Sequence, residues 1–271
     1  MELQGKISLK TRRSYRRGRA YLLPIFVGLV YLILYSPIIV LIVFSFNKNP
    51  LSFKWYGFTF DWYKQLFSSV EILDALKNSL IVAFSSVFLC ITMALFYVFY
   101  GVSSFLNRLM VIFYGSLVAP EIVLAVCLLS IFTFFSIPLG LTTLIVGHTL
   151  IGLAYVVPII KSSFLEMDYG LVEASMDLGA TESQTFYKIV IPILSPAIIS
   201  AALLVLIVSL DDFLISFFCA GASVLTLPMY IFSEIRSGAT PVVNALSTLL
   251  LVVSSFLILI LTAFKLRTRV F

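Results

Sequence analysis

The segment Glu173-Ala174-Ser175-Met176-Asp177-Leu178-Gly179-Ala180, continued by Ile189-Val190-Ile191-Pro192, is the longest polar passage in the second half of a strongly apolar chain. Hydrophobic segments flank it on both sides, which predicts a loop at a membrane surface. Its residue pattern is too regular for a simple connector. We therefore expect this loop, residues 164–193, to dock a partner protein.

The composition places the chain in a membrane. Hydrophobic residues make up 61% and charged residues only 11% of its 271 residues, whereas soluble domains carry about 25% charge. The net charge of +5 does not point to nucleic acid, because the basic residues gather in tails and loops beside apolar segments. No cleavable signal peptide is expected, since the first apolar run is too long for one.

Six segments are apolar and long enough, at about 20 residues, to cross the hydrocarbon core as helices. They are residues 21–46, 76–100, 109–135, 141–163, 194–219 and 244–264. With a cytoplasmic N-terminus, thirteen Lys and Arg residues lie inside and five outside, the asymmetry typical of six spans with both termini in the cytoplasm. The sequence predicts an all-α, polytopic six-helix domain over residues 21–264, between a basic tail (residues 1–20) and a short C-terminal tail (residues 265–271).

The polar loop has the pattern of two short helices. Leu171, Ala174, Ser175 and Leu178 recur at spacings of three and four, which predicts one small, flat face on the first helix. Gly179 follows where a left-handed C-cap belongs.

The second helix begins at a capping box. Thr181 and Gln184 have the required Thr-x-x-Gln spacing. Phe186, Ile189 and Val190 supply its apolar stripe, and we expect Pro192 to end it before the next span. Composition alone leaves two alternatives open: helices that dock a protein, or amphipathic helices resting on the bilayer.

The loop resembles the EAA motif of ABC importer permeases. Glu173-Ala174-Ser175, Gly179, Ile189 and Ile191-Pro192 keep its full spacing, with Ser175 for the usual Ala and Ile191 for the usual Leu. The resemblance implies a type I importer permease fold, in which this loop forms coupling helices that sit in a cleft of the ATPase subunit. The coupling residues so implied are Glu173, Ala174, Ser175, Asp177, Gly179, Ala180, Glu182, Ile189 and Pro192.

Three further segments resemble the spermidine/putrescine permeases, specifically their C-type subunit. They are Pro120-Glu121-Ile122-Val123, Ser209-Leu210-Asp211-Asp212 and Pro241-Val242-Val243-Asn244-Ala245-Leu246. This likeness implies polyamine import across the cytoplasmic membrane. The implied partners are a second permease, two copies of an ATP-binding subunit and an extracytoplasmic polyamine-binding protein. Iron, thiamine or another small solute is the alternative cargo.

Acids inside apolar segments need a reason to stay there, because each costs at least about 2.5–3.5 kcal/mol to insert. Glu121 lies about midway through the third predicted span, beside Pro120, which is expected to bend that helix. Asp211 and Asp212 are adjacent and so point about 100° apart on a helix, which lets only one face a route squarely. We expect these three acids, with Ser209 and Glu234, to face the polyamine route. Salt bridges or hydrogen bonds to a partner permease are the structural alternative.

The outer segments are aromatic or folded back. Residues 47–75 are rich in aromatic side chains, which favours an interfacial belt with a short helix lying on the membrane. The alternative is that Trp55 lines a vestibule for a cationic ligand. Residues 220–243 are expected to fold partly back onto the bundle. A lone His148 in an apolar span is expected to be a satisfied bundle residue rather than a proton relay.

The chain carries no pattern of its own for catalysis. It contains no Gly-x-x-x-x-Gly-Lys-Ser/Thr segment for nucleotide phosphates and no metal-ligand spacing. Cys90, Cys127 and Cys219 are expected to act as small buried hydrophobes. We therefore expect a non-enzymatic subunit with no cofactor. An ion-coupled transporter, or an assembly or sensor subunit, would leave the coupling-loop pattern unexplained.

Overall fold

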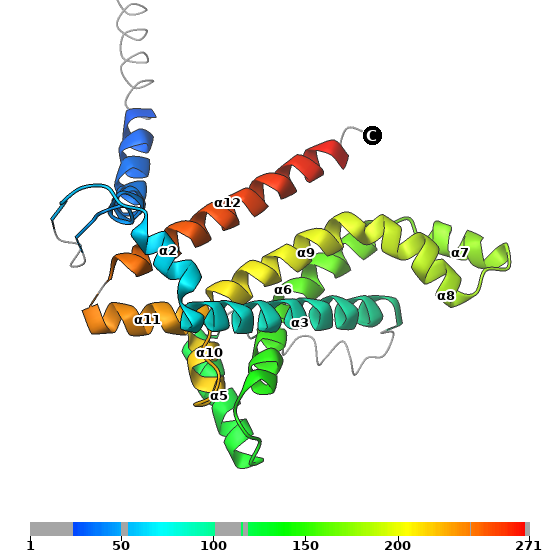
Figure 1. Ribbon diagram of the computed structural model, residues 1–271. Helices are drawn as coiled ribbons and strands as arrows, with labels where there is room; N and C mark the ends of the chain where they lie inside the picture. The colour runs from blue at the N-terminus through cyan, green and yellow to red at the C-terminus, as the bar shows by residue number, and fades with distance from the viewer. Residues whose placement is uncertain (1–23, 50–53, 101–114, 116–118, 239, 269–271) are drawn as a thin grey trace, which may run out of the picture. The chain divides into compact units, whose positions relative to one another are not determined.

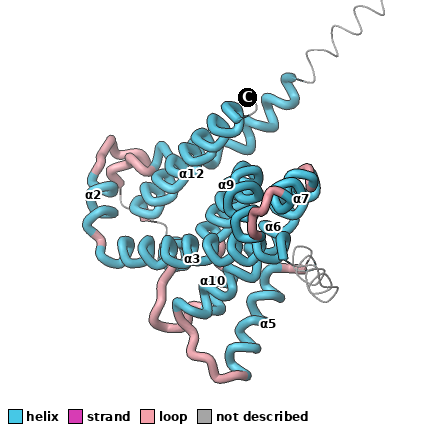
Figure 2. The backbone as a smooth tube through the Cα atoms, turned by 90° about the vertical axis from the view of Figure 1, so that its right-hand side faces the viewer, coloured by secondary structure: helices cyan, strands magenta, loops and turns pink. Residues whose placement is uncertain are grey.

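The computed structural model describes residues 24–49, 54–100, 115, 119–238 and 240–268. The basic tail, the loop with Arg108 and residues 109–114 and 116–118 of the third predicted span lie outside this range. Within it the chain is helical, apart from connecting loops and a bridge between Asn47 and Phe58 (Figure 2). Two units are distinguished: Met1–Gln65 with Ala239–Leu250, and Leu66–Gly238 with Leu251–Phe271.

Several helices are long and apolar enough to cross a membrane. Among the described residues these are Pro24–Phe44, α3 (Val70–Tyr100), α6 (Leu141–Glu166) and the continuous helical stretch Glu182–Asp211. Helix α5 (Glu121–Phe134) and the first part of α12 (Pro241–Thr268) are apolar but shorter. An all-α, multi-pass membrane protein is thus confirmed, while the count of six spans stays a prediction.

Two helices extend past their predicted spans. Helix α3 begins at Val70 rather than at residue 76, and α12 runs from Pro241 to Thr268, into the predicted C-terminal tail. The first turn of α3 contains Glu71, which suits the positive end of the helix dipole and an aqueous setting. Hydropathy marks the part of a helix that crosses hydrocarbon, and backbone hydrogen bonding continues beyond it.

The core of the second unit lies between α3, α6 and α9 (Ile191–Asp211), which pack side by side (Figure 1). Gly152 lets α6 approach both neighbours, because a Cβ there would lie 2.6 Å from Cys90 Sγ and 3.0 Å from Val205 Cγ1. Cys90 is fully buried and its thiol donates to the Thr149 carbonyl. Cys219 is also buried, as expected, but Cys127 is exposed on α5.

A second cluster joins α5 to α10 (Leu214–Cys219). Leu128 and Phe132 of α5 pack with Ile215 of α10 and Leu144 of α6. Gly147 makes this contact possible, since a Cβ there would lie 2.7 Å from Ile215 Cγ2. These two short helices therefore sit against α6 as one layer.

The outer segment after α10 is tied to α3. Helix α11 (Leu227–Gly238) begins where the Leu227 amide donates to Ser79 Oγ at 2.8 Å. The amide group of Asn78 donates to the Leu225 carbonyl at 3.0 Å. This segment folds back onto the bundle, as predicted.

The first unit has a small aromatic core after its long helix. Phe46 stacks on Phe58 with ring centroids 5.0 Å apart, and the indole N–H of Trp62 donates to the Asn47 carbonyl. Asn47 is fully buried and accepts from the Tyr56 amide. The predicted short helix is α2 (Asp61–Ser68).

Candidate functional site

The predicted fifth span is broken at two residues. Helix α9 ends at Asp211, Asp212 takes an extended conformation (φ −69°, ψ 117°), and α10 begins at Leu214. The Asp212 carboxylate accepts from the amide of Ile215 at 3.3 Å and from that of Ser216 at 2.9 Å. It thereby satisfies free N–H groups in the first turn of α10, which stabilises the break within an apolar sequence.

The two adjacent acids have different surroundings. Asp212 is buried, with 4% of its side chain exposed, whereas Asp211 is exposed. The predicted angle of about 100° between them is wrong, because Asp212 is not helical. The Asp212 carboxylate accepts hydrogen bonds from the amides of α10, while Asp211 is exposed. Which of the two acids faces a route stays a prediction.

Glu121 opens a helix instead of interrupting one. Pro120 precedes α5 with an extended backbone (φ −57°, ψ 130°), and Glu121 is the first helical residue. The predicted bend at Pro120 in the middle of a helix is therefore wrong, because a helix begins there. Proline suits a helix start because its missing N–H would be unpaired there in any case. The exposed Glu121 carboxylate lies at the positive end of the helix dipole.

The three acids meet at one cavity of about 430 Å³. Glu121 comes from the start of α5, Asp211 from the end of α9 and Asp212 from the break that follows it. Glu121 and Asp212 are neighbours in this lining. The rest of the described lining is apolar or aromatic: Ala119, Leu124, Ile151, Ala154, Tyr155, Val208, Phe213 and Leu214.

His148 of α6 completes the polar cluster, and sequence reasoning did not connect it to these acids. Its Nδ1 pairs with Ser209 Oγ at 2.7 Å, and its Nε2 lies 3.2 Å from Ser216 Oγ and 3.3 Å from Asp212 Oδ2. The ring is a satisfied bundle residue, as expected. The spacing of Ser209, Asp212 and Ser216, at three and four, was the available signal for one polar face.

The remaining predicted route residues lie elsewhere. Ser209 is buried and pairs with His148 instead of lining the 430 Å³ cavity. Glu234 lies on α11 and is absent from the described lining. Trp55 belongs to the first unit, where it packs edge-on against Phe44 with centroids 6.4 Å apart. A route role for these three stays a prediction.

The polar loop turns at Gly179, as predicted. Helix α7 (Gly170–Asp177) ends in a Schellman motif: the Gly179 amide donates to the Met176 carbonyl and the Ala180 amide to the Ser175 carbonyl. Gly179 has φ +87°, a left-handed conformation that favours glycine. Helix α8 (Glu182–Thr185) then begins with the reciprocal Thr181–Gln184 capping box.

The predicted flat face of α7 is only partly correct. Leu171, Ala174 and Leu178 are exposed, and Leu178 is 89% exposed. Ser175 instead points inward, where its hydroxyl lies 2.7 Å from that of Thr185 on α8. No other part of the described chain covers these apolar side chains, and an exposed apolar face of this kind is typical of a contact with another protein.

Pro192 does not end the second helix. A π-helical turn, η1 (Phe186–Val190), carries the chain from α8 into α9, and the Ile191 amide donates to the Phe186 carbonyl. The wider turn accommodates a proline without a break. Residues 182–211 are therefore one continuous helical stretch.

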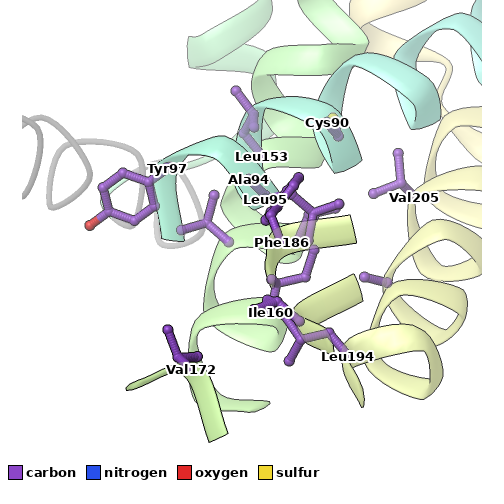
Figure 3. Close-up of a cluster of buried hydrophobic side chains, with 14 residues drawn as sticks. Cys90, Ala94, Leu95, Tyr97, Leu153, Ile160, Val172, Phe186, Leu194 and Val205 are labelled. Carbon is purple, nitrogen blue, oxygen red and sulfur yellow. The ribbon is translucent and has the colours of Figure 1, made fainter. Parts of the chain in front are cut away.

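Phe186 anchors the loop to the bundle. It is 3% exposed and lies within the buried cluster shown in Figure 3. Its ring lies 4.9 Å from that of Phe99 and 5.9 Å from that of Tyr100 at the end of α3. Ile160, Leu194 and Val172 belong to the same buried cluster. Among the implied coupling residues, the exposed ones are Glu173, Ala174, Asp177, Gly179, Glu182 and Pro192, while Ala180 and Ile189 are half-buried.

Comparison with known proteins gives close sequence relatives and fold neighbours. No protein-family model matches the chain. It is 36% identical to the spermidine/putrescine transport system permease protein PotC of Haemophilus influenzae, over 90% of this chain and 96% of that protein. It is 34% identical to the putrescine transport system permease protein PotI of Escherichia coli, over 80% of this chain and 81% of that protein.

Among solved structures, a bacterial ABC transporter that imports the acidic polysaccharide alginate has a similar chain. The TM-score is 0.65 at 17% identity, covering 92% of this chain and 96% of that one. The likeness confirms the predicted permease fold.

Proposed function

Because this chain belongs to the family of spermidine/putrescine ABC importer permeases, we propose that it imports polyamines as one permease subunit of an ATP-driven transporter. The observation that carries the proposal is the meeting of Glu121, Asp211 and Asp212 at one cavity.

This cavity suits a cation with apolar spacers. Two neighbouring carboxylates, such as those of Glu121 and Asp212, repel each other unless a proton or a cation lies between them. A protonated amine supplies both the charge and the hydrogen-bond donors. Apolar walls from Leu124, Ile151 and Val208 suit the methylene groups between amines. Weak binding at more than one acid also lets the cargo leave.

Energy for transport comes from a partner in this proposal. The chain has no phosphate-binding loop, so ATP hydrolysis belongs to a separate ATP-binding subunit and this chain is non-catalytic. The exposed face of Leu171, Ala174 and Leu178 docks in a groove of that subunit. Movement of the docked loop reaches the spans through the continuous helix Glu182–Asp211 and through Phe186 against α3.

The complete transporter contains further subunits. A second permease of similar sequence supplies the other half of the route, two ATP-binding subunits drive it, and an extracytoplasmic binding protein delivers polyamine. The cytoplasmic membrane is the expected location, with the loop of residues 164–193 on the cytoplasmic side, in agreement with the basic residues that flank it.

Uptake by vesicles containing all the subunits tests this proposal. We expect radiolabelled spermidine or putrescine to accumulate with ATP inside and to be unaffected by an uncoupler. Omission of this chain should abolish uptake. Uptake that collapses with the uncoupler would indicate ion coupling. ATP-dependent accumulation of labelled thiamine or iron, without accumulation of polyamine, would indicate another cargo.

A further inference from the structure

His148 joins both sides of the helix break to α6. Ser209, before the break, pairs with Nδ1, and Ser216, after it, lies beside Nε2. Asp212, at the break itself, faces the same Nε2 at 3.3 Å. A single imidazole ring therefore contacts α9, α10 and the residue between them.

Three donors surround the Asp212 carboxylate. They are the amides of Ile215 and Ser216 and the Nε2 of His148. An ionised carboxylate only accepts hydrogen bonds, so Nε2 must carry the hydrogen that faces it. Rotation of the Asp212 side chain would leave buried donors unpaired, which is unfavourable. These three donors therefore fix the position of the Asp212 carboxylate in the cavity wall.

Close packing keeps the ring in place. Gly147, next to His148, allows Ile215 of α10 to approach α6, since a Cβ there would lie 2.7 Å from Ile215 Cγ2. The space between His148, Ser209 and Asp212 is about 10 Å³, the lower limit for one water molecule. A water molecule therefore has little room to replace the imidazole ring as the hydrogen-bond donor to Asp212.

We propose that His148 is a positioning residue for transport: its Nε2–H fixes Asp212 as an immobile negative charge beside Glu121, where an ammonium group of the cargo binds. The proposal rests on the proposed function, because it assumes a cationic cargo. Glu121 and Asp211, which are exposed, contact the ammonium groups directly, and Asp212 supplies a charge whose place does not change.

Two substitutions separate the contacts of the ring. The amide nitrogen of glutamine reaches the place of Nε2, whereas that of asparagine reaches only the place of Nδ1. H148Q therefore keeps a donor toward Asp212, and H148N keeps a partner for Ser209 alone. Both replace the ring with an amide, so they are matched in polarity.

The test measures KM and turnover of polyamine uptake by the reconstituted transporter. Loss of one charge-assisted contact predicts a KM about tenfold higher for H148N, with turnover changed much less. H148Q should recover most of that loss. D212N should raise KM similarly, and H148N with D212N should be no worse than D212N alone. Ser130→Ala, which removes an exposed hydroxyl on α5, is the control.

Equal KM values for H148N and H148Q, or effects of H148N and D212N that multiply, would overturn the positioning role. If H148N does not assemble with its partners, D212N decides, and a native KM for D212N contradicts the proposal. Absence of polyamine uptake by the wild-type transporter would instead contradict the proposed function, and with it the cationic cargo assumed here.

Discussion

Ser175 on α7 and Thr185 on α8 place their hydroxyl oxygens 2.7 Å apart, and both side chains are buried. Ser175 also donates to the Val172 carbonyl at 2.9 Å, so the hydrogen between the two hydroxyl groups comes from Thr185. This pair joins the two halves of the proposed coupling loop across the turn at Gly179.

The direction of that hydrogen bond predicts unequal effects of two substitutions. S175A leaves a buried Thr185 donor without its partner and should cost about 1–3 kcal/mol locally, whereas T185V keeps the Ser175–Val172 bond and should cost less. Amide hydrogen exchange across α7 measures this local stability. The double variant should resemble T185V. Equal loss of protection in both single variants would contradict the assigned direction.

A residue other than glycine at position 179 should weaken the turn. Its φ of +87° disfavours a side chain by about 1–2 kcal/mol, although a Cβ at this position would have no other atom within 4 Å. G179V should stay in the membrane but bind ATP-binding subunits less well, and G179N should be milder because asparagine tolerates this conformation. Copurification measures the effect, with Gly28→Ala as the control. Native association and uptake by G179V would exclude a coupling role for the turn.

The exposed Leu178 side chain predicts a docking contact. L178D should leave this chain folded, since the residue is 89% exposed, but should weaken ATP-binding-subunit association by about 1–2 kcal/mol, or roughly tenfold. L178M, which stays apolar, is the matched control. Affinity can be measured in detergent or nanodiscs. If the two variants bound equally well, this face would not be the docking surface.

The contact at Gly152 predicts a compensating pair. G152A places a Cβ 2.6 Å from Cys90 Sγ and should force α3 and α6 apart, at a cost of about 1–3 kcal/mol. Adding C90A to G152A removes the sulfur atom that the new methyl group would meet, so it should recover part of the lost stability. Recovery is only partial because the methyl group still meets Val205. Thermal unfolding of the purified transporter measures both. No recovery in the double variant would mean that Cys90 is not the obstacle.

Local signals explain which parts of the fold are predictable from the sequence. The turn at Gly179 and the Thr181–Gln184 box involve neighbours in sequence, so their patterns predict them correctly. Apolar composition likewise predicts the membrane helices. The inward direction of the Ser175 side chain depends on its contact with Thr185 across a turn. The spacing of residues along one helix cannot predict a contact with another helix.

The cavity depends on contacts between distant segments. The run of residues 194–219 is apolar enough for one helix, and only the backbone cap made by Asp212 shows where it breaks. Pro120 within an apolar run predicts a bend, but its place before Glu121 makes it a helix start. The cost of acids in a membrane identifies them in the sequence, whereas their meeting and their link to His148 follow from packing alone.

The most direct measurement is the uptake of labelled polyamine by vesicles with E121Q or D211N in the complete transporter. Each charge-neutral change should raise KM about tenfold or more by removing a charged contact, while ATP-binding-subunit association stays normal. D61N, which changes an exposed acid paired with Thr59, is the matched control and should transport normally. Native KM and turnover in both E121Q and D211N would contradict a polyamine route through this cavity.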